Sequence, residues 1–168
     1  MKMFDFVPQL AKMLKNLDGW MTKAEAHAKQ KGYEVDTLCH ARLAPDQYAF
    51  VRQVQSTCDA AKFSVAYLAA KEPPAHPDTE TTFAQLHARI HSCMSFLETV
   101  SEKDLEGAEA RRIAPKWAQG KWMPGDRSLV EMALPNFYFH VSMAYAILRH
   151  NGVDLGKTDF MGALPFRD

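Results

Sequence analysis

Apolar residues recur at helical spacing in residues 126–152, DRSLVEMALPNFYFHVSMAYAILRHNG. Steps of three and four residues place side chains on one face of an α-helix. The stripe, which includes two polar residues, comprises Leu129, Met132, Ala133, Asn136, Phe137, His140, Met143, Ala144 and Ile147. A helix with one apolar face is stable when that face packs against another element. The segment therefore predicts a helix over 126–150 that ends before Gly152.

Three segments upstream show the same periodicity, over residues 5–31, 46–70 and 79–100. Their stripes run through Val7, Leu10, Leu14, Leu17, Met21, Ala24 and Ala28, then Phe50, Val54, Cys58, Ala61, Val65 and Leu68, then Phe83, Leu86, Ile90, Cys93, Leu97 and Val100. Asp46 and Thr79 are the expected N-caps of the second and third helices. Four amphipathic helices bury their stripes by packing against one another, so the sequence predicts an all-α fold, a four-helix bundle.

The connections carry further expectations. In residues 107–124 a turn-prone Gln119-Gly120 pair lies between two Lys-Trp pairs, which predicts a small hairpin or extended flap before the last helix. Pro135 cannot donate a backbone hydrogen bond, so we expect it to kink the last helix near Glu131. The Pro-rich segment 71–78 has the composition of an ordinary loop.

The chain length of 168 residues suits one domain, which predicts a single helical domain over 1–168. The tail, 153–168, keeps Phe160, Met161, Leu164 and Phe166 and is too apolar for a free end. We expect it to pack on the bundle or on a partner subunit. Together with the aromatic-rich last helix, it predicts a homodimer.

The composition excludes several classes of protein. Twenty basic and twenty acidic residues leave a formal net charge of zero, without the basic excess that nucleic-acid binding requires. Cys39, Cys58 and Cys93 form no CxxC pair, which favours a reducing, cytoplasmic location and neither disulfides nor a zinc knuckle. Cys58 and Cys93 lie on apolar stripes and are expected to be buried and inert. No apolar run has the length of a signal peptide or a membrane span, so no membrane partner is expected.

Two groups of histidines stand out. His87 and His91 are four residues apart on one helix face and in reach of one metal ion, but they lie at the margin of the stripe, where solvated surface histidines are the expected interpretation. His140 lies within the stripe of the last helix, one turn after Asn136. It is either a buried structural histidine or a pocket-lining ligand or general base.

The second helix supplies the residues expected to face His140. Gln55, Ser56 and Asp59 flank its stripe, and Asp59 and Lys62 are spaced for an ion pair within the helix.

The segments 134–152, LPNFYFHVSMAYAILRHNG, and 41–55, ARLAPDQYAFVRQVQ, resemble a bacterial family of domains of unknown function within the DinB-like superfamily. The resemblance spans nearly the whole chain. It implies a DinB-like bundle with up-down-down-up helix order and a long connection, often as a homodimer. It also implies a divalent-metal site of three histidines, one on the second helix and two spaced by four on the last, which some members use in thiol-dependent transfer reactions.

Carried onto this sequence, the paired positions of the last helix fall at Asn136 and His140, and the position on the second helix falls at Gln55 or Ser56. One of the three ligands is therefore histidine. Neutral amide oxygens bind zinc or nickel poorly, so no metal cofactor is expected, and zinc or nickel remains the alternative.

Three hypotheses follow. The first is a DinB-like bundle that binds a small molecule in a pocket between its second and fourth helices. The second is a divalent-metal-dependent transferase or hydrolase with a degenerate site of His140, Asn136 and Gln55 or Asp59. The third is a structural or interaction protein in which the same side chains form a buried hydrogen-bond network.

Overall fold

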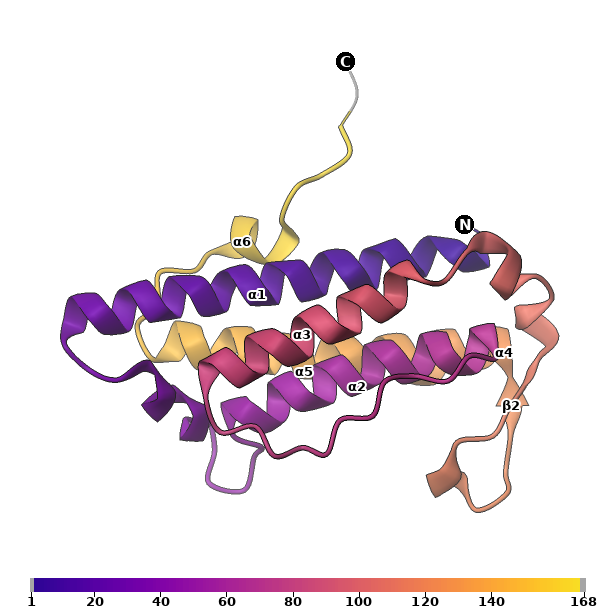
Figure 1. Cartoon of the computed structure of the whole chain (residues 1–168), viewed down its shortest axis with the longest axis horizontal. Helices are drawn as coiled ribbons and strands as arrows, with labels where there is room; N and C mark the ends of the chain where they lie inside the picture. The colour runs from indigo at the N-terminus through magenta and orange to yellow at the C-terminus, as the bar shows by residue number, and fades with distance from the viewer. Residues whose placement is uncertain (1, 167–168) are drawn as a thin grey trace.

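The computed structural model describes residues 2–166 and is mostly helical (Figure 1). Its four long helices are α1 (Phe6–Lys31), α2 (Phe50–Ala69), α3 (Phe83–Glu98) and α5 (Leu134–His150). The shorter elements are the 3₁₀ helices Met3–Asp5, Val35–His40, Glu102–Leu105, Ala108–Ala110 and Lys116–Ala118, the strands β1 (Arg112–Ile113) and β2 (Met123–Pro124), α4 (Gly125–Arg127), the π-helical segment Ser128–Ala133, and α6 (Lys157–Met161).

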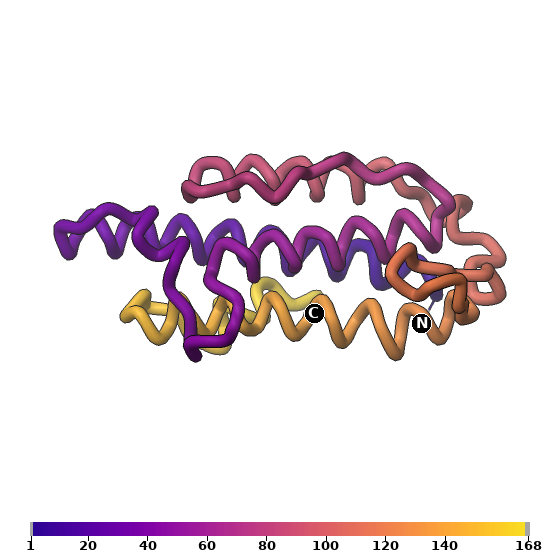
Figure 2. The backbone as a smooth tube through the Cα atoms, turned by 90° about the horizontal axis from the view of Figure 1, so that it is seen from below, coloured from indigo at the N-terminus to yellow at the C-terminus, as the bar shows by residue number. Residues whose placement is uncertain are grey.

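The long helices pack side by side around one apolar core. Each of α3 and α5 contacts both α1 and α2. Figure 2 shows α3 and α5 on opposite sides of the layer that α1 and α2 form. Every apolar residue of the first three predicted stripes is buried, which confirms the periodicity on which the helices were predicted.

Two helices begin four residues later than predicted. Asp46 lies in a turn, and α2 begins at Phe50, whose amide donates to the Ala41 carbonyl. The N-cap of α3 is Thr82 rather than Thr79. The Thr82 hydroxyl accepts from the Gln85 amide at 3.3 Å, while the Gln85 side chain accepts from the Thr82 amide at 3.2 Å. This reciprocal capping box fixes the start of the helix.

The last helix departs most from its predicted pattern. Phe137 and Val141 are buried, but Asn136 is exposed and His140 is half-buried. At Glu131, where a kink caused by Pro135 was expected, the chain forms the π-helical segment Ser128–Ala133. Because Pro135 has no amide hydrogen for the Glu131 carbonyl, the chain widens there, and the wider turn rotates the following residues relative to a regular helix. Asn136 and His140 consequently lie beside the core face rather than on it.

The predicted flap is present as a hairpin at the end of the bundle where α2 ends (Figure 1). Strands β1 and β2 pair antiparallel, with Ile113 opposite Met123. Gln119 and Gly120 both have positive φ, as the turn requires. At the base of the flap, a Cβ on Gly125 would lie 1.9 Å from the Ala108 carbonyl oxygen, so only glycine fits.

The tail folds back onto its own chain as far as α6. The indole of Trp20 stacks on Phe160 with ring centroids 5.4 Å apart, and Trp20 Nε1 donates to the Asp159 carbonyl at 3.0 Å. Figure 1 shows α6 beside α1. Beyond it, Leu164 and Phe166 are exposed. Within residues 2–166, no helix combines the length and apolar character that crossing a membrane demands.

Candidate functional site

A groove of about 810 Å³ lies between α2 and α5 and extends to the flap. We call it the α2–α5 groove. Four aromatic residues contribute to its wall: Tyr48, Phe63, Tyr67 and Trp117. Trp117, on the flap, is 71% exposed, and Tyr48 precedes α2 and is 52% exposed. Large aromatic side chains that border an open groove are typical of a surface that contacts a ligand.

His140 is the central polar residue of the groove, and its hydrogen bond fixes its tautomer. Its Nδ1 lies 2.8 Å from Oε1 of the fully buried Gln53. The Gln53 amide nitrogen donates to the Tyr48 carbonyl at 3.4 Å, which orients the amide with its oxygen toward His140. Nδ1 therefore carries the proton, and Nε2 keeps a lone pair.

The charge state of His140 agrees with that assignment. Burial lowers the pKa of the imidazole, and the positive charge of Arg52 lowers it further. A neutral ring with Nε2 unprotonated is a hydrogen-bond acceptor. Among the described residues, Nε2 has no hydrogen-bond partner, so it is available to a ligand.

The predicted site residues divide into two groups. Ser56 and Asn136 line the α2–α5 groove together with His140. Asp59 also lines it, but its Oδ1 is 2.9 Å from Lys62 Nζ and 2.7 Å from Arg89 Nη2. The predicted ion pair of Asp59 with Lys62 is thus present, and a carboxylate held by two cations is a poor base or ligand.

Gln55 does not face the groove, contrary to its expected place. It is buried and donates from Nε2 to Glu80 Oε2 at 2.9 Å, while its Oε1 accepts from Arg52 at 3.3 Å. Gln55 therefore belongs to the packing between α2 and the connection that precedes α3.

A family model described as "Domain of unknown function (DUF1993)" matches residues 3–161. The chain belongs to the DUF1993 family. No curated protein matches the chain at a significant level. A crystal structure of a DinB family member protein from Shewanella denitrificans is similar to it, with 46% sequence identity and a TM-score of 0.93 over 96% of this chain and 92% of that one. The resemblance to a domain of unknown function within the DinB-like superfamily is thereby confirmed.

The groove of this DUF1993 chain does not fit the three-histidine metal site of the superfamily. At the matching positions, His140 offers one imidazole nitrogen, Asn136 an amide and Ser56 a hydroxyl. Zinc and nickel favour imidazole, thiolate and carboxylate ligands, and the nearby Asp59 carboxylate is already neutralised. One strong donor cannot hold such an ion tightly.

The cysteines of the DUF1993 chain are structural. Cys58 and Cys93 are fully buried, as predicted, and the Cys93 thiol donates to the Cys58 carbonyl at 3.6 Å. Burial raises the pKa of Cys39 to about 11. None of the three is an accessible thiolate nucleophile.

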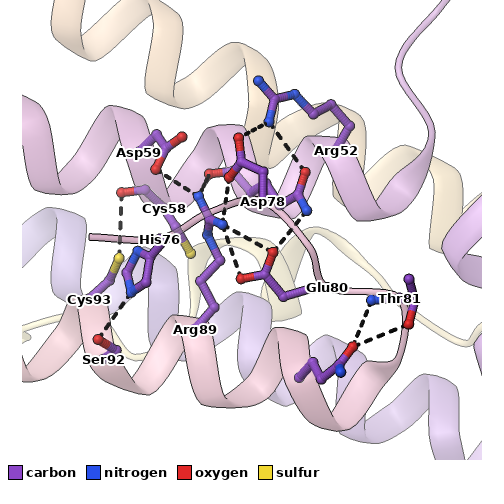
Figure 3. A network of polar contacts seen from close by, with 12 residues as sticks. Arg52, Cys58, Asp59, His76, Asp78, Glu80, Thr81, Arg89, Ser92 and Cys93 are labelled. Atoms are coloured by element: carbon purple, nitrogen blue, oxygen red, sulfur yellow. Dashed lines mark hydrogen bonds and ion pairs between the residues drawn. The ribbon is translucent and has the colours of Figure 1, made fainter. Parts of the chain in front are cut away.

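A charged network that no sequence motif indicated lies beside the groove (Figure 3). The Arg89 side chain is 1% exposed and contacts Asp59 at 2.7 Å, Asp78 at 2.7 Å and Glu80 at 3.1 Å. Arg52, which lines the groove, also pairs with Asp78.

This network ties the connection between α2 and α3 to both helices. The segment 71–78 is therefore not the ordinary loop that its composition predicts. The acidic residues Asp78 and Glu80 were a weak signal, because their partner Arg89 is recognised only once α3 is placed. The His76 ring completes the contact by bridging Lys62 Nζ at 2.8 Å and the Ser92 hydroxyl at 3.1 Å.

The expectation of two solvated histidines on α3 is wrong for His87. Its side chain is 17% exposed, and its Nδ1 lies 2.5 Å from Asp18 Oδ1, a residue of α1. His91, at 62%, is exposed as predicted. The tertiary contact with α1, which no spacing along α3 reveals, accounts for the difference.

Proposed function

We propose that this protein binds a small organic molecule in the α2–α5 groove. The observation that carries the proposal is the lone pair of His140 Nε2, which no described residue occupies, at a groove bordered by Tyr48, Phe63, Tyr67 and Trp117. The groove volume is in the range of natural ligand sites, and the combination of aromatic walls with a few polar groups is typical of them.

The lining indicates the chemistry of the ligand. His140 Nε2 accepts a hydrogen bond, so the ligand should present an O–H or N–H group to it. Asn136 supplies an amide that both donates and accepts. The charge of Asp59 is balanced by Lys62 and Arg89, and that of Arg52 by Asp78. A neutral molecule with an aromatic ring and a hydroxyl or amide group fits this surface best.

Thermal unfolding in the presence of a panel of small phenols and aromatic amides tests the proposal. A bound compound raises the melting temperature with increasing concentration because it stabilises only the folded state. Trp117→Ala should abolish that shift. Trp122→Ala is the matched control, since Trp122 is also on the flap and 51% exposed but does not line the α2–α5 groove. Equal loss of the shift in both variants, or no shift with any compound, would count against the groove.

The alternative is a divalent-metal-dependent transferase or hydrolase. What favours it is the orientation of His140, since a ligating histidine commonly donates its other ring nitrogen to a supporting acceptor, as His140 does to Gln53. Metal analysis of untagged wild type and His140→Ala separates the two functions. Near-stoichiometric zinc or nickel that is lost in His140→Ala would replace the small-molecule proposal with this one.

We also propose the finer organisation that the resemblance implies: one domain with up-down-down-up helix order, a cytoplasmic location and a homodimeric state. The helix order is supported by the connection after α2, which runs back along the bundle in Figure 1 so that α2 and α3 begin at the same end. The exposed apolar residues Val130 and Phe139 near and on α5 support association. Sedimentation at micromolar concentration should give the mass of two chains, and a monomer there would refute the dimer.

A further inference from the structure

The cluster of Asp18, His87 and His91 lies between α1 and α3, away from the helix pair that forms the groove. Asp18 Oδ1 is 2.5 Å from His87 Nδ1 and 3.1 Å from His91 Nε2. One ligand atom from each of the three side chains lies within 4.8 Å of the others. Two imidazoles and a carboxylate are thus gathered around one point from two helices.

The histidine spacing explains how α3 presents both rings to that point. Residues four apart lie one above the other on a helix face. The two ring centroids are 6.3 Å apart. A metal ion bound to both rings would bridge two side chains one helical turn apart on α3, and the carboxylate of Asp18 approaches it from α1.

A second observation comes from the other nitrogen of His87. Its Nε2 is buried and has no hydrogen-bond partner among the described residues. The nearest acidic atom is Glu25 Oε1, 3.6 Å away. A buried ring nitrogen without a hydrogen-bond partner is uncommon, and this one faces a carboxylate just beyond hydrogen-bonding distance.

Metal binding would resolve this arrangement. A histidine that coordinates a cation through Nδ1 carries a proton on Nε2, and Nε2–H of His87 would then point at Glu25, whose Oε1 is 3.6 Å away. A ligating histidine supported by a carboxylate at its other nitrogen is the usual arrangement at zinc sites. The position of this nitrogen beside Glu25 is compatible with a His87 that coordinates a metal through Nδ1.

We propose that Asp18, His87 and His91 bind a divalent transition-metal ion, zinc, with Glu25 as the supporting residue. Two imidazoles and one carboxylate are ligands that zinc takes at about 2.0–2.2 Å, with a fourth position open to water. Magnesium and calcium fit this site poorly, because both ions prefer ligand sets made of oxygen atoms. The site joins α1 to α3 and uses none of the residues of the α2–α5 groove.

The required movement is small. Two ligands of a tetrahedral zinc ion are about 3.3 Å apart, given metal–ligand distances near 2.0 Å. The His91 nitrogen is already close to that separation from Asp18 Oδ1, and the carboxylate must withdraw from His87 by less than about 1 Å. The two ring nitrogens, which lie within 4.8 Å of one another, must approach to about 3.3 Å. His91 is exposed, so its ring is free to adjust.

Isothermal titration of untagged, chelator-treated protein with zinc chloride tests the site. We expect one zinc ion per chain, and no heat with magnesium chloride. His91→Ala removes a ligand on the surface and Asp18→Asn is isosteric, so neither should prevent folding, and each should weaken zinc binding by more than about tenfold. Glu25→Gln should weaken it by about tenfold if Glu25 supports His87.

His150→Ala is the control, because His150 is exposed and belongs to neither site, and its zinc affinity should equal that of wild type. Absence of zinc binding below about 1 mM in wild type would overturn the proposal. So would an unchanged affinity in His91→Ala. Zinc lost in His140→Ala but kept in His91→Ala would assign the metal to the groove instead, which contradicts both this site and the small-molecule function.

Discussion

His140, in the wall of the groove, is linked to the interior of the bundle by its hydrogen bond with Gln53. Its Nδ1 donates to Gln53 Oε1, which is fully buried. His140→Ala leaves that oxygen without its donor, so we expect the free energy of unfolding to fall by about 1–3 kcal/mol. Urea denaturation measures the change. His150→Ala, an exposed histidine on the same helix, should cost almost nothing, and equal effects of the two substitutions would contradict the Gln53 contact.

Arg89 is the residue whose loss should damage the fold most. It is buried among Asp59, Asp78 and Glu80, and its removal leaves carboxylates with less compensating charge. Arg89→Met should lower the free energy of unfolding by about 3–5 kcal/mol, as expected when one partner of a buried ion pair is removed.

Arg127→Met provides the comparison for Arg89, measured by the same denaturant titration. Arg127 is exposed and pairs with Glu131 one turn away. Exposed pairs contribute less than about 1 kcal/mol, so this variant should remain close to wild type. A loss of similar size in both variants would show that the Arg89 network does not have the proposed role.

At the level of the elements, the start of α3 depends on one cap. Thr82→Ala removes the acceptor of the Gln85 amide and should destabilise the protein by about 1 kcal/mol. Thr79→Ala is the matched control, because Thr79 is exposed and lies outside the helix. Thermal denaturation distinguishes the two positions. A greater loss of stability in Thr79→Ala would indicate that Thr79 is the N-cap, as the sequence alone predicts.

The two caps illustrate which features of the elements the sequence determines. The stripes of α1, α2 and α3 were predictable because burial of an apolar face follows directly from its spacing. The starts of α2 and α3 were not, since several Thr and Asp residues precede each stripe and only the folded backbone selects one. The core-facing stripe of α5 was misplaced at Asn136 and His140, because the π-helical segment before Pro135 changes the phase of the helix.

The candidate site shows the same division. His140, Asn136 and Ser56 were identified from the sequence and line the α2–α5 groove. Asp59 is paired with Arg89, and Gln55 is hydrogen-bonded to Glu80 and Arg89. These partners lie about 25 to 34 residues away along the chain. Contacts at that separation are set by tertiary packing and have no signature in local periodicity.

For the whole molecule, the charged groups predict a loss of stability in acid. Burial alone would raise the pKa of Asp78, but hydrogen bonds from Arg52 and Arg89 bring it below its ordinary value of 3.8. Burial opposes the shift at Glu80 as well, and its backbone hydrogen bond and Arg89 bring its pKa below the ordinary 4.5. The stabilising effect of these carboxylates is complete above their ordinary pKa values and is lost as the pH falls through the lowered ones.

Two histidines add to this effect nearer neutral pH. Burial lowers the pKa of His76 below 6.5, and the charges of Lys62 and Arg89 act in the same direction. His140 is lowered likewise. Their stabilising effect is complete above pH 6.5 and declines as the pH falls below that value toward the lowered pKa.

The free energy of unfolding should therefore fall steadily from pH 7.5 to pH 4. Urea titrations at four pH values across this range measure it. The decline between pH 7 and pH 6 should be smaller in His140→Ala than in wild type, since one titrating histidine is absent. A stability that stays constant or rises toward pH 4 would contradict the assigned directions.

Nuclear magnetic resonance of isotope-labelled protein tests the claim that the α2–α5 groove receives a small organic molecule. Titration with the phenol and amide panel should shift the signals of Ser56, Trp117, Asn136 and His140 in a saturable manner. Signals of Trp122 and His91, which lie outside the groove, should stay in place. Saturable shifts confined to another face of the bundle, or no shifts with any compound, would contradict the claim.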